Sequence, residues 1–443
     1  MLEKTYIDCG DPAVDIGNRE LEELFSSALS RALSDIKNSG HVIILPPDIT
    51  RFHSRAGFLT ETASRVLGGR LGAVLPALGT HSSMNDAELK RMFGGTPREK
   101  FLVHDWRHGI TELGRIEENW VEKAVEGAVR YDWPVQVNKI LRRDGDFSLA
   151  LSIGQVVPHE VAGMANHAKN LFVGTGGKEA IDKSHFAGAA YGMERIMGRA
   201  DTPVRALFDE GLRRFSSGLP PILWVLTVIG ARTDSEAQAA GKERGSLAVR
   251  GLFIGFGREC FEKAAALSRE VNVNLENEQV NKVIVYLEPE EYRTTWLGNK
   301  AIYRTRMLIA DGGELLILAP ALERFGEDLG MDAIIRKHGY RSGREIIAKA
   351  ASNAELGGNL SAAAHLIHGS SENRFTIRYC PGEKVTRKEI ESVGFQWGDL
   401  NEVRQHCDIS KLASGWNTLA DGEKIFYVPN PALGLWAEKQ RFN

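Results

Sequence analysis

Apolar residues in the first part of the chain alternate between helical spacing and short continuous runs. Residues 19–38 place leucine and phenylalanine three or four positions apart, which predicts an amphipathic helix. Val42–Leu45 is an apolar run closed by two prolines, a pattern typical of a buried parallel strand. A predicted helix over 59–67 and a predicted strand over 72–78 repeat the scheme. The alternation indicates an α/β fold.

The same alternation continues to the end of the chain. Further strands are predicted at 101–105, 135–140, 147–157, 222–229, 282–287, 314–318, 374–379 and 424–428. Further helices are predicted from Asn85 or Asp86 (the cap) onward, and at 206–215, 258–271, 296–309 and 331–353.

The strand–helix alternation restarts near residue 273, which suggests a second domain. We therefore expect two α/β domains with Rossmann-like parallel sheets and an interdomain active-site cleft. The predicted N-terminal domain, 1–265, is the catalytic and cofactor-binding one, and the C-terminal domain is 266–409. The last segment, about 410–443, is a candidate to return to the first domain.

Composition narrows the classes of function. The net charge of −3 gives no electrostatic reason to expect nucleic acid or an anionic membrane as a partner. Four widely spaced cysteines without a C-x-x-C pair argue against a disulfide framework and favour a reducing compartment. The N-terminus does not resemble a signal peptide, and the apolar run at 220–230 is too short to span a bilayer. We expect a cytoplasmic protein.

Polar residues follow several of the predicted strands. Asp48, Thr50 and Arg51 come directly after the first strand, where open α/β sheets bind their ligands. His81, His104 and His159 likewise each follow a strand. One such histidine would be unremarkable, but three predict a common crevice.

The stretch from Gln155 to Met193 concentrates the remaining chemistry. It contains His159, His167 and His185 together with Lys169 and Lys178. Seven glycines, counted from position 154, allow the backbone to approach a ligand closely. A lysine buried in a ligand cleft has a lowered pKa, as covalent amine chemistry requires.

Three other patterns are weaker. Lys178, in GTGGKEA, resembles a phosphate-loop lysine, but Phe172 and Glu179 stand where that motif needs glycine and serine or threonine. The GFG at 255–257 is an incomplete dinucleotide fingerprint, for which helix capping and packing are the simpler explanation. His365 and His368, three apart, are a minor candidate for metal binding.

Four segments resemble the lactate racemase family, and a fifth does so more weakly. They are Asp48–Arg51 (DITR), Ala77–Leu89 (ALGTHSSMNDAEL), Pro158–Lys169, Asn170–His185 and, weaker, Gly298–Leu318. The resemblance covers most of the chain in pieces. Its most specific part is the spacing of ten residues from His159 to Lys169 and sixteen from Lys169 to His185.

The family uses a nickel-pincer nucleotide, a pyridinium-3-thioamide-5-thiocarboxylic acid mononucleotide carrying nickel. The resemblance implies that Lys169 forms the covalent link to this cofactor and that His185 is the protein ligand to nickel. It also implies that His81 and His159 are the paired acid–base residues. Arg51 and Lys300 would bind the substrate carboxylate, and Asp48 and Thr50 would support the cofactor.

The function that the resemblance implies is racemisation or epimerisation at C2 of a 2-hydroxy acid by reversible hydride transfer. Two imidazoles suit such chemistry because each titrates near neutral pH and exchanges a proton with the hydroxyl group. The substrate stays open among lactate, malate-like, aromatic and sugar acids, and the partners implied are this small molecule and the cofactor-synthesis proteins. The alternatives are a non-catalytic protein that binds the nucleotide and a hydrolase or lyase with histidine-bound zinc.

The chain departs from the family pattern at four places. The family has a glycine pair where this chain has Asn166-His167, and proline where it has Val173. It has Arg-Pro where this chain has Ser82-Ser83, and glutamine where it has Leu297. Changes of this kind around a substrate are how a relative comes to accept a different or larger hydroxy acid.

Overall fold

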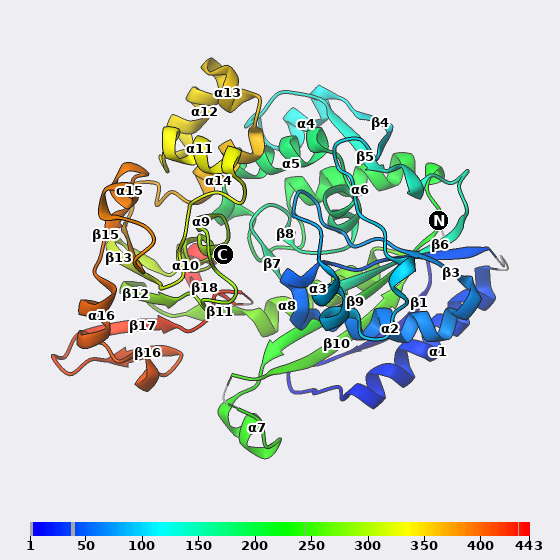
Figure 1. Cartoon of the computed structure of the whole chain (residues 1–443), viewed down its shortest axis with the longest axis horizontal. Coiled ribbons are helices and arrows are strands. Elements are labelled where there is room, and N and C mark those ends of the chain that lie inside the picture. Colours follow the sequence, from blue (N-terminus) through cyan, green and yellow to red (C-terminus); the bar gives the residue numbers. More distant parts are fainter. Residues whose placement is uncertain (1–2, 37–39, 244, 433) are drawn as a thin grey trace. The chain divides into compact units, whose positions relative to one another are not determined.

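The computed structural model describes residues 3–36, 40–243, 245–432 and 434–443 (Figure 1). The chain divides into two compact units. The first unit comprises Met1–Ser184 and Ile196–Asn272, and the second comprises His185–Arg195 and Val273–Asn443. The domain limits expected from the sequence, 1–265 and 266–409, stay a prediction, to which the structure adds that residues 185–195 group with the second unit.

A mixed sheet with strand order β1-β10-β9-β6-β2-β3 forms the centre of the first unit. Its strands are β1 (Thr5–Gly10), β2 (His41–Leu45), β3 (Leu71–Val74), β6 (Phe147–Gln155), β9 (Ile222–Ala231) and β10 (Leu247–Gly255). β9, β6, β2 and β3 run parallel to one another, whereas β10 and β1 add antiparallel strands at one edge. The sheet confirms the predicted α/β class.

Helices cover both faces of this sheet. The helices of the unit are α1 (Asn18–Ile36), α2 (Ala56–Leu67), α3 (Asp86–Phe93), α4 (Glu118–Ala124), α6 (Pro203–Phe215), α7 (Asp234–Ala239) and α8 (Glu259–Asn272). α5 (Lys178–Tyr191) contains the boundary between the units, which falls after Ser184. Two short hairpins, β4 (Ile110–Ile116) with β5 (Trp133–Asn138) and β7 (Pro158–His159) with β8 (Gly163–Met164), complete the unit.

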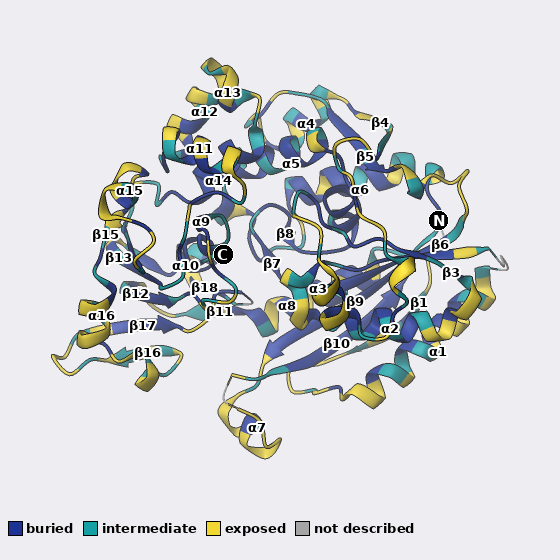
Figure 2. Cartoon of the chain, viewed as in Figure 1, coloured by how far each residue is buried: buried dark blue, intermediate teal, exposed yellow. Residues whose placement is uncertain are grey.

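The apolar positions of the strands fix which helix lies on which face. Leu223 and Val225 of β9 belong to one core cluster with the apolar side of α1 and α2. Because side chains alternate along a strand, Trp224 points to the opposite face, where α8 packs on β9 and β10. β6 and β9 are accordingly buried almost throughout (Figure 2).

The second unit has its own sheet, with strand order β15-β14-β13-β12-β17-β16. Its strands are β12 (Val280–Tyr286), β13 (Ile309–Ala319), β14 (Thr376–Pro381), β15 (Gln396–Trp397), β16 (Gly415–Thr418) and β17 (Lys424–Val428), beside the pair β11 (Val273–Glu276) and β18 (Leu435–Glu438). Its helices are α9 (Thr295–Gly298), α10 (Lys300–Thr305), α11 (Leu329–His338), α12 (Gly343–Ser352), α13 (Ala354–Gly357), α14 (Leu360–His368), α15 (Arg387–Ser392), α16 (Leu400–His406) and α17 (Lys439–Phe442).

The C-terminal segment behaves differently from the expectation. Residues 410–443 supply β16 and β17 to the second unit's sheet and β18 to its small pair. β17 pairs in parallel with β12. Its continuous apolar run is typical of a strand that is covered on both faces of a sheet. The segment thus stays in the second unit rather than returning to the first.

Several predicted elements change length or break. Residues 101–105 make only one bridge, from Phe101 to Val74, so the predicted strand there is wrong. The helix predicted over 296–309 is interrupted at Asn299, and its last residues enter β13. The helix predicted over 331–353 ends at Gly339, whose φ of 66° lies in the left-handed region that stops helices.

Two expectations from composition can be compared with the structure. All four cysteines are free thiols. Among the described residues, no helix combines the length and apolarity needed to cross a bilayer.

Candidate active site

Several candidate residues of the first unit lie just after the carboxyl ends of three neighbouring parallel strands. The chain runs from β2 to β3 on one side and later returns to β6 on the other side of β2. The carboxyl ends of β2 and β6 therefore flank a topological switch point, the position where open α/β sheets bind ligands. Asp48 follows β2, His81 follows β3 and His159 follows β6.

Asp48 and His81 form the most sharply defined pair at this edge. Asp48 caps the short helix η1 (Ile49–Ser54) and accepts a hydrogen bond from the Thr50 amide at 3.0 Å. Its other carboxylate oxygen, Oδ2, lies 2.6 Å from Nδ1 of His81. Burial raises the pKa of Asp48, but His81, Thr50 and Arg51 outweigh it and hold the pKa at about 2.

The ionised Asp48 fixes how the His81 ring carries its proton. A carboxylate can only accept, so Nδ1 of His81 is the donor, and Nε2 is the basic nitrogen of the neutral ring. A histidine that is oriented in this way by a buried carboxylate is a ready general base. The sequence assigned Asp48 to the cofactor, whereas the structure shows it as the partner of His81.

Lys169 has the environment of a reactive amine. Its side chain is only partly accessible, and in the described part of the chain no hydrogen bond or ion pair holds its ammonium group. Burial and the positive charge of Arg51 lower its pKa from 10.5 to about 8, against the opposing charges of Glu160 and Asp48. At pH 7, such a lysine carries about 300-fold more free amine than an ordinary one.

The residue after Lys169 ties it to the switch point. The side-chain nitrogen of Asn170, Nδ2, donates to the carbonyl of Leu45 in β2 at 3.2 Å and to the Ser152 hydroxyl in β6 at 2.9 Å. Lys169 itself precedes a π-helical turn, η5 (Asn170–Gly174), a rare geometry that is frequent at functional sites. Asn170 was not singled out by the sequence, although its place next to the lysine was a usable signal.

His159 is buried at the end of the β6 segment, in strand β7. Its Nδ1 accepts a hydrogen bond from the backbone amide of Val161 at 3.1 Å. The neutral ring therefore carries its proton on Nε2, which lies 4.0 Å from Glu160 Oε1. His159 and His81 thus have opposite tautomers, one ready to donate a proton from Nε2 and the other to accept one there.

Arg51 supplies a positive charge near the carboxyl ends of these strands. It lies in η1 with a non-helical backbone (φ −113°, ψ 31°), and its charge acts on both Asp48 and Lys169. Within the described residues no carboxylate forms an ion pair with its guanidinium. A guanidinium that is left without an acidic partner beside a reactive amine is suited to hold a carboxylate.

The two-residue turn before Lys169 has positive φ angles, which are typical of glycine, although neither residue is a glycine. Asn166 and His167, at the positions of the family's glycine pair, have φ values of 68° and 55°. Asparagine tolerates this left-handed region, whereas histidine there is strained by roughly 1 kcal/mol or more. The two residues therefore adopt a backbone conformation that glycine would adopt without strain.

Neighbouring groups hold this turn in place. The guanidinium of Arg205, which is fully buried, donates to the carbonyls of Met164 at 2.5 Å and Asn166 at 3.1 Å. On the other side the Asn166 amide packs on Gly154, where a Cβ atom would lie 2.4 Å from the Asn166 nitrogen. Sequence reasoning missed Arg205, because a buried arginine looks like any helical arginine in the sequence.

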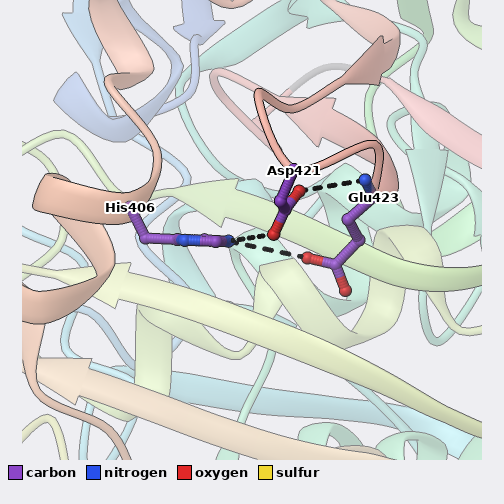
Figure 3. Close-up of side chains that lie close together, drawn as sticks. All are labelled: His406, Asp421 and Glu423. Carbon is purple, nitrogen blue, oxygen red and sulfur yellow. Dashed lines mark hydrogen bonds and ion pairs between the residues drawn. The ribbon is translucent and has the colours of Figure 1, made fainter.

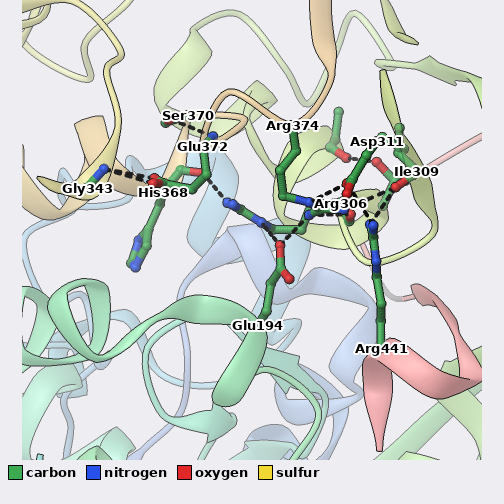
Figure 4. A network of polar contacts seen from close by, with 12 residues as sticks. Glu194, Arg306, Ile309, Asp311, Gly343, His368, Ser370, Glu372, Arg374 and Arg441 are labelled. Atoms are coloured by element: carbon green, nitrogen blue, oxygen red, sulfur yellow. Dashed lines mark hydrogen bonds and ion pairs between the residues drawn. The ribbon is translucent and has the colours of Figure 1, made fainter. Parts of the chain in front are cut away.

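His185 and Lys300 belong to the second unit. His185 is partly buried on α5, and Lys300 begins α10 with its ammonium 5.5 Å from the ring centre of Tyr292. Residues 185–195 are held within this unit by Glu194, which accepts from Arg306 at 2.9 Å and Arg374 at 2.7 Å (Figure 4).

His104, grouped with His81 and His159 because of its position after a predicted strand, has the contacts of a structural residue. It is buried, and its two nitrogens bond the carbonyl of Gly176 and the side chain of Asn138, each at 3.0 Å. Burial lowers its pKa. Lys178 is likewise occupied, in a short ion pair with Asp182.

Among the described residues, a search for three or more metal-type ligands finds one group, His406, Asp421 and Glu423 (Figure 3). It lies on the surface of the second unit, and Glu423 is already paired with Lys282 at 2.6 Å. The group includes none of the histidines proposed for catalysis. It gives no support to the zinc hydrolase alternative.

Comparison with known proteins fits this geometry. Residues 11–195 match the lactate racemase N-terminal domain. The matched region contains β2, β3, β6 and Lys169, the elements that build the strand-end site. The architecture is that of a mixed α/β protein whose N-terminal region is similar to that of the lactate racemase family.

Two solved structures share the fold. A crystal structure of a protein from Thermotoga maritima matches 96% of this chain and 100% of its own, with a TM-score of 0.78 and 22% identity. The lactate racemase apoprotein from Thermoanaerobacterium thermosaccharolyticum matches 98% of this chain and 97% of its own, with a TM-score of 0.68 and 16% identity. No curated protein matches the chain.

Proposed function

We propose that the protein is a racemase or epimerase that inverts C2 of a 2-hydroxy acid with a nickel-pincer nucleotide. The observation that carries the proposal is the combination of the Asp48–His81 pair with the unpartnered amine of Lys169 at the carboxyl ends of β2, β3 and β6. The match of residues 11–195 to the lactate racemase N-terminal domain supports the same chemistry.

The two histidines would move the hydroxyl proton. His81 accepts at Nε2 because Asp48 holds its other nitrogen protonated, and the imidazolium that forms is stabilised by the same carboxylate. His159 presents a protonated Nε2 because backbone amides occupy its Nδ1. One histidine thus removes the proton of one enantiomer while the other returns it to the opposite enantiomer.

The residues present suit the cofactor. A covalent amide-type link needs an uncharged amine, and Lys169 combines a pKa of about 8 with an ammonium group that no carboxylate neutralises in the described structure. His185 would be the nickel ligand, in keeping with the preference of nickel for imidazole in planar sites. When bound, the nucleotide would supply the acceptor for the C2 hydrogen.

Arg51 and Lys300 would fix the substrate. A guanidinium binds a carboxylate through two parallel hydrogen bonds, which sets the plane of the acid and turns C2 toward a defined position. Asp48 keeps the local charge near balance by offsetting Arg51. Thr50, whose hydroxyl bonds Asp48 at 2.5 Å, would support the cofactor side through this carboxylate.

The decisive experiment is a screen of enantiopure 2-hydroxy acids in deuterium oxide, with protein made in cells that also make the cofactor. We expect loss of optical rotation for one class of acid while the C2 hydrogen is retained as protium. Retention distinguishes hydride transfer from proton abstraction, which would introduce deuterium from solvent. Loaded protein that inverts none of the lactate, malate-like, aromatic and sugar acids would contradict the proposal.

A further inference from the structure

One cavity is lined entirely by residues of the first unit. It has a volume of about 690 Å³, within the usual range for small-molecule sites. Its wall is mainly apolar, from Leu212, Leu219, Pro220, Ile222, Trp224 and Phe256. Trp224 points to the α8 face of the sheet, and Ile222 begins β9, so the cavity lies toward the amino end of that strand.

One part of this wall is polar and unsatisfied. His167 lines the cavity with only 3% of its surface exposed, stacked between Trp224 at 4.2 Å and Phe261 at 5.2 Å between ring centres. Neither of its nitrogens has a hydrogen-bond partner in the described structure, and the same holds for Oδ1 of Asp209. Buried groups of this kind are costly unless something satisfies them.

The distance between the two groups indicates what would satisfy them. Nδ1 of His167 and Oδ1 of Asp209 are 3.9 Å apart, too far for a hydrogen bond with each other. A single oxygen placed to the side of the line that joins them would lie about 2.8 Å from both, the ordinary hydrogen-bond length. That oxygen must donate to the carboxylate and accept from the imidazole N–H, which is what a hydroxyl group does.

The charges around the pair favour an uncharged ligand. The Arg258 guanidinium already pairs with Asp209, Asp201 and Glu262. The two terminal nitrogens of Arg205 each donate a hydrogen bond to a backbone carbonyl. The two other arginines of the cavity wall donate to Glu210 (Arg213) and to the Leu219 carbonyl (Arg143). An anion placed beside the pair would face the carboxylate of Asp209, while an ammonium would face Arg258 at short range.

We propose that this cavity binds a small, uncharged aromatic alcohol of the phenol type, with its ring against Trp224 and its hydroxyl between His167 and Asp209. The proposal does not depend on the racemase chemistry. It also gives a reason for a strained histidine in a left-handed turn, since the ring reaches the cavity from a backbone position that a glycine would occupy more comfortably.

Three fluorinated aromatic probes, of which the phenol and the toluene are equal in size, test this idea by fluorine NMR on the full chain without cofactor. They are 4-fluorophenol, 4-fluorotoluene and 4-fluorobenzoate. We expect 4-fluorophenol to bind at least about fivefold more tightly than 4-fluorotoluene, because one extra satisfied hydrogen-bond pair is worth about 1 kcal/mol or more. Binding of 4-fluorobenzoate should be weaker than both. Equal affinities for phenol and toluene, or preferred binding of benzoate, would overturn the proposal.

Two variants locate the site. His167→Gly suits the left-handed backbone and should remove the preference for 4-fluorophenol while 4-fluorotoluene still binds. Asp209→Asn should reduce the same preference with the imidazole intact, and it provides an independent result if His167→Gly fails to fold. His108→Gly, at an exposed histidine outside the cavity, is the matched control and should leave all three affinities unchanged. An unchanged preference for phenol in folded His167→Gly would place the binding elsewhere.

Discussion

The two units each contain a buried cluster of polar side chains, but the clusters differ in how completely their members are paired. In the second unit, His365 is bonded at Nδ1 by Tyr303 and at Nε2 by Tyr340, each at 3.0 Å, and Tyr340 also bonds Thr295 at 2.7 Å. In the first unit, Lys169 and Arg51 keep charged groups that no described residue pairs with.

This difference in hydrogen bonding distinguishes polar side chains with a structural role from those that are available to bind a ligand. A closed network such as that of His365 stabilises one arrangement and has no hydrogen-bonding capacity left for a ligand. An open cluster costs stability when the protein folds, because its charged groups lose water without gaining partners. Such a cost is retained only where a bound molecule makes use of it, which is why pairing separates the two clusters better than residue type does.

The largest expected effect comes from removing the open amine. Lys169→Ala should abolish racemisation and the mass increase that the cofactor causes in cells that make it. Lys169→Arg is the matched control for charge, and it should fail equally because a guanidinium is a poor nucleophile. An unchanged mass of the wild-type protein in such cells would contradict covalent attachment, and a mass increase without activity on any acid would indicate a nucleotide-storing protein.

Next in size is the Asp48–His81 pair. His81→Ala should retain the cofactor but reduce kcat by roughly 10²–10⁴-fold, the usual contribution of a positioned acid–base group. Asp48→Asn should reduce it by about 10–100-fold, because the amide no longer fixes the histidine tautomer. The Asp48 variant should also shift the pH at which activity is half-maximal, which a purely structural role would not do. Full activity in either variant would remove that residue from the pair.

The third prediction concerns pH and the stability cost of Lys169. Its pKa is lowered from 10.5 to about 8 in the folded state, so between these values the unfolded chain binds more protons and folding stability rises with pH. Lys169→Met should therefore stabilise the cofactor-free protein at pH 7, by at most about 3 kcal/mol and less where solvent screens the charge.

Chemical denaturation of both proteins at pH 7 and pH 10 measures this difference. The advantage of the methionine variant should shrink as the pH rises through about 8 and be nearly gone above 10.5. A variant less stable than the wild-type protein at pH 7 would show that the amine is not a strained group.

The closed cluster should respond in the opposite way. Tyr340→Phe removes the hydroxyl shared by His365 and Thr295, leaves both buried groups short of a partner, and should destabilise the protein by about 1–3 kcal/mol. Thermal unfolding measures the loss. Cofactor attachment at Lys169 should be unaffected, and a selective loss of attachment without destabilisation would mean that the second cluster is functional as well.

The smallest effect is expected at Asn166. Asn166→Gly should change the free energy of unfolding by less than about 1 kcal/mol, since glycine adopts the left-handed turn freely but loses the side-chain contacts. Asn166→Ala should cost about 1–2 kcal/mol because alanine is disfavoured at a φ of 68°. Urea unfolding of the two variants distinguishes them, and equal values would show that the turn is not strained.

Much of the first unit could be predicted from the sequence because its signals are local. The apolar run closed by prolines marks β2, and the Asn85 cap with Glu88 three residues on marks the start of α3. The strand predicted at 101–105 failed because one bridge to Val74 satisfies that segment and the rest follows a loop. Helix breaks at Asn299 and Gly339 were missed because helical spacing of apolar residues continues across them.

Only part of the candidate site could be predicted from the sequence. The family resemblance proposed Lys169, His81 and His159, and their roles stay predictions, whereas the pairing of Asp48 with His81 joins residues 33 positions apart, which no local pattern reveals. His104 has the same sequence context as the catalytic candidates and differs only in being fully bonded. What separates reactive from structural side chains here is hydrogen bonding across the fold, and this information is not local in the sequence.

The packing of Asn166 on Gly154 has a consequence for the evolution of this family. Because a Cβ at position 154 would lie 2.4 Å from the Asn166 amide, the two positions restrict each other. Relatives with glycine at 166 should be free to carry alanine or serine at 154, whereas those with asparagine should keep glycine. A lineage that acquires Asn166 therefore has to hold Gly154 already, so the order of substitutions is constrained and the pair should covary among relatives.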